Sequence, residues 1–270
     1  MTVICRFDDG GTPRYGIVEG DSVTGVTGGA FGPYRKAGPR LPAAQLRYLP
    51  PVIPPVFYAA GLNYKGHAER ASALASAGGG RQVPERAEIG YRATSALTGH
   101  GSPIVRPADC AEALVAEGEL VAVIGPGGVP RHATREQARA AIFGWTIGND
   151  VSARGWQRAD RTFWRSKNSD TFKPMGPFLV TADAVDPLSS TTTLAVDGAV
   201  AASFPTGDML FDPHDFIVAM SRYITIGPGD VIWLGTDETA SVVPGQEIAI
   251  TIDGLGTLSN PVTEEKLIHE

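Results

Sequence analysis

Cysteine and long apolar runs are what this chain has least of. Cys5 and Cys110 are the two cysteines among 270 residues, too few and too far apart for a disulfide framework. No stretch has the uninterrupted apolar length of a membrane-spanning helix, and residues 1–30 lack the pattern of a signal peptide. We therefore expect a protein of the reducing cytoplasm that has no membrane partner.

Positive charge is scarce as well. The 23 lysines and arginines are outnumbered by 29 acidic residues, and the net charge of −6 argues against a general affinity for nucleic acid. The segment RGWQRADRTFWRSK (154–167) interleaves basic residues with tryptophan, which can mark a nucleic-acid-binding strip. Because this segment is short and the chain is acidic, binding of a small anionic substrate explains it more simply.

Glycine and proline, by contrast, are abundant. The 33 glycines and 21 prolines favour many short strands and turns over long helices. Residues 5–29 alternate apolar and polar side chains around Asp-Gly and Gly-Asp turns, which predicts a small antiparallel sheet. The proline-rich residues 48–55 predict a linker. We expect a mainly β fold with some α, divided into a small N-terminal β domain with its linker (1–52) and a main domain (53–270).

Three segments carry helix or loop signals. Thr134 and Gln137 have the spacing of a capping box for a short helix. Pro213 predicts the first turn of another helix, over residues 213–222. Residues 65–88 begin with helix formers but continue without the periodicity of a packed element, which is typical of a functional lid or of disorder.

Three carboxylates lie in stretches that are otherwise apolar. Glu117 and Glu119 occur in VAEGELVAVIG, and Asp150 follows in GWTIGNDVSARGWQ. Both stretches are typical of buried strands, where residues two apart point to the same face. Alone, each carboxylate is explained as well by a solvated strand edge or a turn cap. Together they predict a site for a hard divalent cation such as Mg²⁺, because buried carboxylates need compensation.

Basic and polar side chains accompany the carboxylates. Lys167 lies in a polar stretch where a lysine is usually solvated, but near a metal centre it would hold an anionic substrate or stabilise an enolate. Arg154 and Gln157 follow Asp150 by four and seven residues, so a helical turn would place them on one face with it. His67 precedes the predicted lid and is either a structural residue at a helix start or a general base on water.

Five successive segments together resemble the fumarylacetoacetate hydrolase family. They are GLNYKGHAE, EGELVAVIG, GWTIGNDVSARGWQ, KNSDTFKPMGPF and SRYITIGPGDVIWLGT. The resemblance covers about residues 53–260, and a small N-terminal region is typical of shorter members. It implies a mixed β-sandwich roll whose main domain is catalytic, with a lid at about 65–88. It also implies a homodimer, Mg²⁺ or Mn²⁺ as cofactor, and small 2-oxo or β-diketo acids as substrates.

The resemblance also implies roles for single residues. The metal ligands would be Glu117, Glu119 and Asp150. The catalytic residues would be His67, Lys167 and Glu69, with Lys167 supporting the substrate oxyanion. The substrate-binding residues would be Arg154, Gln157, Thr236, Tyr64 and Arg92.

Two positions depart from the family pattern. Many hydrolytic members pair the lid histidine with a glutamate three residues later, where this chain has Arg70. Glu69 is two residues from His67 and would point elsewhere on a helix, so Glu85 or Glu88 would have to replace the missing carboxylate. The family's T-G-T-P-E-G turn is L-G-T-D-E-T here, which changes the pocket wall around the threonine.

The sequence therefore predicts an enzyme that cleaves a C–C bond in a small acylpyruvate or β-diketo acid by hydrolysis, through a metal-stabilised enolate. If His67 cannot serve as a base, decarboxylation or keto–enol isomerisation of a 2-oxo or hydroxymuconate-type diacid on the same site becomes the better prediction. A non-catalytic small-molecule binding protein with the same fold is the alternative of another class.

Overall fold

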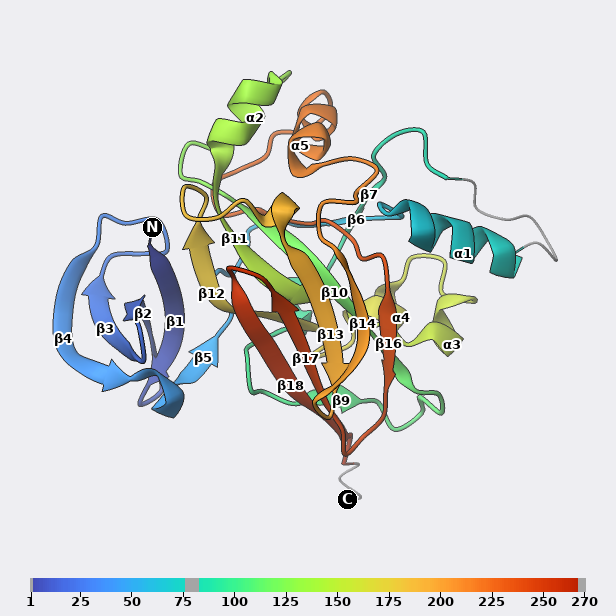
Figure 1. The fold of residues 1–270 in the computed structure, drawn as a ribbon, viewed down its shortest axis with the longest axis horizontal. Helices are drawn as coiled ribbons and strands as arrows, with labels where there is room; N and C mark the ends of the chain where they lie inside the picture. Colours follow the sequence, from blue (N-terminus) through green and yellow to red (C-terminus); the bar gives the residue numbers. More distant parts are fainter. Residues whose placement is uncertain (1, 76–82, 267–270) are drawn as a thin grey trace.

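Two β-sheets packed against each other dominate the molecule. The computed structural model describes residues 2–75 and 83–266, and in Figure 1 the smaller sheet lies in front of the larger one. Contacts between β10 and β13, β11 and β17, and β12 and β18 join the two layers. The predicted mainly β fold with some α, arranged as a mixed sandwich, is confirmed.

The larger sheet has 13 strands, and its main path runs β4-β3-β2-β1-β12-β11-β10-β15-β6-β7. It is mixed, because β15 pairs in parallel with β6 and β8 pairs in parallel with β12, while the other neighbours are antiparallel. Its strands are β1 (Val3–Asp9), β2 (Thr12–Glu19), β3 (Ser22–Thr27), β4 (Arg35–Pro42), β5 (Arg47–Leu49), β6 (Phe57–Ala60), β7 (Ile89–Tyr91), β8 (Leu97–Thr98), β10 (Leu114–Ile124), β11 (Ile142–Asn149), β12 (Lys173–Thr181), β15 (Val231–Trp233) and β16 (Thr239–Val242).

The smaller sheet has five strands in the order β14-β13-β17-β18-β9. Alternate residues of β17 are buried, as expected for a strand with one face on a core and the other toward solvent. The strands are β9 (Ile104–Arg106), β13 (Thr191–Val196), β14 (Ala199–Pro205), β17 (Glu247–Ile252) and β18 (Gly256–Glu264).

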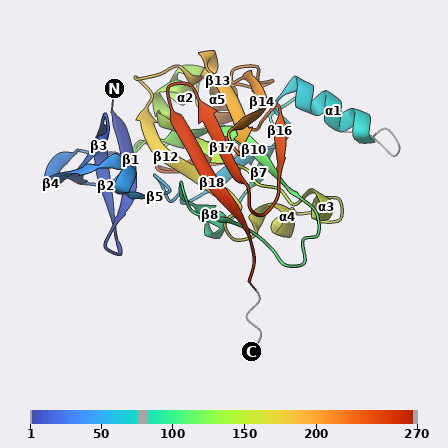
Figure 2. The same cartoon turned by 60° about the horizontal axis from the view of Figure 1, so that its bottom comes forward.

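The N-terminal strands continue the larger sheet. β1 pairs antiparallel with β12, with Cys5 opposite Phe178, so the β1–β4 meander extends the sheet past β12. In Figures 1 and 2 these strands form the blue lobe at one side of the molecule.

The helices lie around the edges of the sandwich. They are α1 (Lys65–Ala75), α2 (Arg135–Ala141), α3 (Arg154–Gln157), α4 (Trp164–Asn168) and α5 (Pro213–Ser221), with 3₁₀ turns at Ala43–Gln45, Thr94–Ala96 and Pro187–Ser189. The predicted capping box of Thr134 and Gln137 is confirmed at the start of α2, and Asp212 and Asp215 form another at α5. None of these helices is long and apolar enough to cross a membrane.

Helix α1 projects away from the sandwich in both ribbon views (Figures 1 and 2). It occupies the first part of the predicted lid at 65–88. Residues 76–82 of that prediction lie outside the described residues, and the chain is described again from Val83.

Strand β10 is the centre of the molecule. It pairs with β11, β15 and β16, and all but one of its residues are buried. Gly118, in its middle, has no room for a side chain. A Cβ there would lie 2.9 Å from Cγ2 of Ile250 and 3.0 Å from Cδ1 of Leu194, both in the smaller sheet. The glycine therefore lets the two layers approach while its two glutamate neighbours point the other way.

We expect Gly118→Ala to lower the free energy of unfolding by about 1–3 kcal/mol, since a methyl group forced into a packed core displaces its neighbours. Denaturant unfolding measures this. Gly127→Ala is the matched control, because a Cβ at Gly127 meets nothing within 4 Å. Equal stability of the two variants would contradict the packing described.

Candidate functional site

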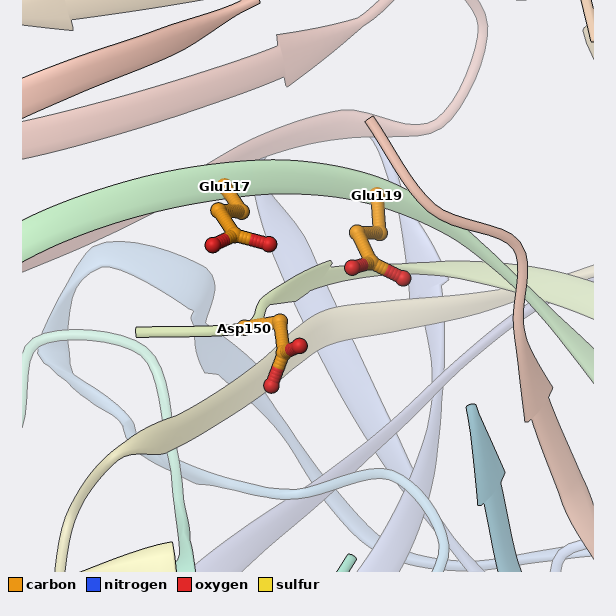
Figure 3. Close-up of side chains that lie close together, drawn as sticks. All are labelled: Glu117, Glu119 and Asp150. Carbon is orange, nitrogen blue, oxygen red and sulfur yellow. The ribbon is translucent and has the colours of Figure 1, made fainter. Parts of the chain in front are cut away.

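Three buried carboxylates converge beside β10. Glu117 and Glu119 point from one face of the strand, and Asp150 faces them from the end of β11 (Figure 3). The backbone fixes this arrangement, because Gly118 pairs with Asn149 and the N–H of Asp150 donates to the carbonyl of Glu117 at 3.0 Å. One oxygen from each carboxylate lies within 4.8 Å of the others.

Asp150 is held by three cations. Arg92 donates to both of its oxygens, at 3.0 and 2.8 Å, while Nζ of Lys167 lies 2.6 Å and Nζ of Lys173 2.8 Å away. Burial opposes ionisation of this carboxyl, but Arg92, Lys167 and Lys173 outweigh it and hold its pKa well below the usual value. Asp150 is therefore a fixed negative charge.

Glu117 is ionised for a similar reason. Its oxygens accept from the Ser152 hydroxyl at 2.7 Å and from Lys167 at 3.0 Å, and a guanidinium nitrogen of Arg154 lies 2.8 Å away. Burial raises its pKa, but Lys167 and Arg154 lower it by more, and the net shift is downward. Lys167 thus bridges Glu117 and Asp150.

Glu119 is the least compensated member of the group. It accepts one hydrogen bond, from the Gly235 N–H at 2.8 Å. Burial, followed by the charges of Asp150 and Glu117, raises its pKa to about 8. A third carboxylate that must be charged beside two others needs a further positive charge. Three carboxylate oxygens within reach of one point are the donor set that Mg²⁺ or Mn²⁺ prefers, so these residues could hold such an ion.

Two of the basic side chains, Arg154 and Lys167, lie on the short helices α3 and α4. Asp160 accepts from the N–H groups of Arg165 and Ser166 at 3.0 and 2.8 Å, which anchors α4 and with it the buried Lys167. Arg154 and Gln157 lie on α3 and are joined by a hydrogen bond of 2.9 Å.

The prediction that a helical turn would align Arg154 and Gln157 with Asp150 is wrong. Asp150 directly follows β11, and the chain forms a bridge between Ser152 and Val115 before α3 begins. The pairing with β10 thus continues past Asp150, and the helix begins only at Arg154. Arg154 nevertheless reaches Glu117, and Gln157 lines the same cavity, although neither shares a helix face with Asp150.

His67 reaches the site from α1. Its Nδ1 lies 3.1 Å from the main-chain carbonyl oxygen of Asp237. A carbonyl can only accept, so Nδ1 carries the proton and Nε2 is left as the basic nitrogen. Burial lowers the pKa of this ring; Glu117 and the carbonyl raise it, Arg154 and Arg70 lower it, and the net shift is downward.

One cavity of about 80 Å³ brings most of the predicted site residues together. Nine of them line it: His67, Arg92, Glu117, Glu119, Asp150, Arg154, Gln157, Lys167 and Thr236. The other two lie elsewhere. Glu69 is 59% exposed and pairs with Lys65 at 3.8 Å, whereas the buried Tyr64 donates its hydroxyl to the carbonyl of Thr206 at 2.7 Å. The catalytic and binding roles of all eleven stay predictions.

A larger cavity of about 730 Å³ adjoins the inner one. Ala60, Gly61, Leu62, Arg92 and Phe163 line both, and Glu85 and Glu88 line the outer one. The two glutamates that were alternative partners for His67 are therefore placed in the outer space.

Lys173 is the residue that the sequence reasoning missed. It is fully buried in β12, donates to the carbonyls of Val151 and Phe172, and pairs with Asp150 at 2.8 Å. Burial lowers its pKa to about 8, against the opposing charge of Asp150. The available signal was a lysine between Phe172 and Pro174 in an apolar strand, which implies a buried negative partner.

Comparison with known proteins gives two family matches. Residues 56–263 match the family model described as fumarylacetoacetate (FAA) hydrolase C-terminal, and residues 4–51 match the one described as Rv2993c-like, N-terminal. The mitochondrial oxaloacetate tautomerase FAHD2A of Homo sapiens is 34% identical over 236 residues, which cover 83% of this chain and 72% of that protein.

Solved structures agree over nearly the whole chain. The crystal structure of a 5-carboxymethyl-2-hydroxymuconate delta-isomerase from Mycobacterium smegmatis has a TM-score of 0.84 and 32% identity, covering 98% of this chain and 100% of that one. A maleylpyruvate hydrolase from Sphingobium sp. SYK-6, in complex with manganese(II) and pyruvate, has a TM-score of 0.78 and 29% identity over the same shares. With a family model spanning residues 56–263 and these relatives, the chain belongs to the fumarylacetoacetate hydrolase family.

Proposed function

We propose that this chain is a metal-dependent isomerase that interconverts the keto and enol forms of a small 2-oxo diacid. The observation that carries the proposal is the contact between His67 and the main-chain carbonyl of Asp237, beside the carboxylate cluster. The ring keeps one nitrogen for proton exchange, but among the described residues no carboxylate forms a hydrogen bond with it. This is a base suited to a mild proton transfer.

The charge of the site supports a substrate with two negative charges. Four cationic side chains face three carboxylates: the cations are Arg92, Arg154, Lys167 and Lys173. With all three carboxylates ionised the cluster has one positive charge in excess, and the divalent ion that would ionise Glu119 raises the excess to three. A dicarboxylate is attracted to such a site and a neutral molecule is not.

The chain's own residues would bind and orient the substrate. A bound Mg²⁺ or Mn²⁺ would act as a Lewis acid on the 2-oxo carbonyl. Lys167 contacts two of the three carboxylates, and its ammonium would stabilise the negative charge that develops on the substrate oxygen. Arg154, Gln157 and Thr236 line the same cavity and would fix the substrate carboxylate.

His67 would move the proton. Nε2 takes it from the carbon next to the 2-oxo group and returns it at the oxygen, so the product has the composition of the substrate. The lowered pKa of the ring, with burial as its main cause, keeps it neutral near pH 7 and able to accept. Hydrolysis demands more, because a base that activates water gains from a carboxylate that stabilises the imidazolium. Arg70 stands where that carboxylate would be.

Hydrolysis of a small acylpyruvate is the second candidate. The outer cavity of about 730 Å³ has room for an acyl group, and the maleylpyruvate hydrolase relative is 29% identical to this chain. The two reactions would share the carboxylates and Lys167 and differ in what His67 must do.

We expect His67→Ala to lower kcat for enol–keto conversion of oxaloacetate by about 10²–10⁴-fold with KM little changed, as for loss of a general base. The decay of enol absorbance measures this, with a panel of acylpyruvates assayed in parallel. His214→Gln, on α5, is the matched histidine control and should retain activity. Unchanged tautomerisation by His67→Ala, or faster acylpyruvate cleavage by the native chain, would exclude the isomerase proposal.

We expect Mn²⁺ to bind more tightly as the pH rises from 6 to 8, by up to about tenfold per pH unit, since the ion must displace the proton of Glu119. Titration calorimetry in buffers of different ionisation enthalpy measures both the affinity and the proton released. Glu119→Gln should bind weakly and without this pH dependence. Binding of wild-type strength by that variant would remove Glu119 from the ligand set.

The same carboxyl makes the metal-free protein sensitive to pH. The pKa of Glu119 rises from its ordinary 4.5 to about 8 on folding, so between these values the folded chain holds a proton that the unfolded chain releases. The stability contribution of this group is therefore largest below about pH 4.5 and falls as the pH rises toward 8. Mn²⁺ should offset this loss in thermal unfolding, and Glu119→Gln should lack it.

A further inference from the structure

Arg70 ties helix α1 to the turn that carries Thr236. Its guanidinium donates to the main-chain carbonyl of Asp237 at 2.6 Å and to the Asp237 carboxylate at 2.9 Å. A second guanidinium nitrogen lies 3.2 Å from the carboxylate of Glu238. These ion pairs are partly exposed and screened by water, so their contribution is one of geometry more than of stability.

The carbonyl that Arg70 holds is the one that accepts from His67. A carbonyl oxygen has two lone pairs, and here one hydrogen bond comes from Arg70 at 2.6 Å and the other from Nδ1 of His67 at 3.1 Å. Both donors stand on α1, three residues apart, so they lie on neighbouring turns of one helix face. Arg70 and His67 thus both donate a hydrogen bond to the main-chain oxygen of Asp237.

The helix is built to approach this turn closely. Gly66 precedes His67, and a Cβ there would lie 2.8 Å from Oδ1 of Asp237 and 3.1 Å from a guanidinium nitrogen of Arg70. Any larger residue at this position would push the Asp237 side chain and Arg70 apart. The contact between Arg70 and Asp237 therefore depends on a glycine at position 66.

We propose that Arg70 is a positioning residue that fixes the Asp237 carbonyl and, through it, the ring direction and the Nδ1–H tautomer of His67. This inference rests on the proposed proton-transfer role of His67. Arg70 thus occupies the sequence position of a carboxylate partner and orients the same ring by a different route, through a main-chain acceptor instead of a side-chain one.

Burial is the main reason why the pKa of His67 is lowered, and the charges around the ring act in both directions. Glu117 on β10 faces it as a negative charge, and Arg154 on α3 and Arg70 on α1 face it as positive charges, with the Asp237 carbonyl at Nδ1. A carboxylate in place of Arg70 would favour the imidazolium instead. The cation at Arg70 adds to the effect of burial and favours the form of the ring that accepts a proton.

The test uses the full chain labelled with ¹⁵N at histidine. In the native chain we expect the ¹⁵N shifts of His67, assigned by comparison with His67→Ala, to be those of the Nδ1–H tautomer. Arg70→Met keeps the length of the side chain and removes its donors, so we expect a mixture of tautomers and a fall of about tenfold or more in kcat with KM little changed. Arg70→Lys, which can still donate to the carbonyl, should restore part of both.

Lys65→Met is the matched control, because it removes an exposed cation from the same helix without touching the turn. It should leave the His67 tautomer and kcat unchanged. If Arg70→Met and Arg70→Lys leave the tautomer unchanged, or the native ring carries its proton on Nε2, the positioning role is wrong.

The tautomer is read without a substrate, so the two proposals fail separately. If the native chain has no isomerase activity but Arg70→Met still shifts the tautomer, the positioning role stands and the proposed function falls. If Arg70→Met does not fold, the comparison of Arg70→Lys with the native chain decides the matter, because its single ammonium changes the hydrogen bond while keeping the charge.

Discussion

The rest of this structure depends on the cost of keeping Asp150 charged inside the protein. Arg92, Lys167 and Lys173 surround that carboxylate within 3.0 Å, and they come from three different parts of the chain. All three cations are buried with it, and a buried cation needs a negative charge such as this carboxylate beside it. The packing of α4, the start of β12 and the loop after β7 is therefore set by one electrostatic requirement. A metal site becomes possible because this network leaves Glu119 with too little compensation.

The carboxylate cluster and the proposed proton-transfer residue His67 lie on different parts of the fold. Glu117, Glu119 and Lys173 stand on β10 and β12, Asp150 directly follows β11, and Lys167 stands on the short helix α4. His67 and Arg70 stand on α1, which projects from the sandwich in Figure 1, and both side chains contact the main-chain carbonyl of Asp237. Under the proposed function, isomerisation and hydrolysis would both use the charged cluster, and the groups on α1 and the 235–238 turn would decide between them.

Much of this could be predicted from the sequence, for physical reasons that are local. Glu117 and Glu119 have strand spacing in an apolar run, and Thr134 with Gln137 has the spacing of a capping box, so neighbours along the chain decide both. The predictions that failed needed contacts between distant residues. The extended backbone at Ser152, because of which α3 begins only at Arg154, depends on a bridge to Val115. Lys173 could not be recognised as part of the site because its partner, Asp150, lies 23 residues earlier. The acceptor for His67 is a main-chain oxygen 170 residues later.

The acceptor for His67 has a property that a side chain would not have. Asp237 can be replaced by any other amino acid and the carbonyl oxygen at that position is still encoded, because every residue supplies one. An enzyme that orients its base with a glutamate can lose that partner through one nucleotide change. Here the partner itself cannot be deleted, and only the path of the turn can change. Selection would therefore act on what shapes the turn, such as Gly66, Gly235 and Arg70, and on the Asp237 side chain through its ion pair with Arg70.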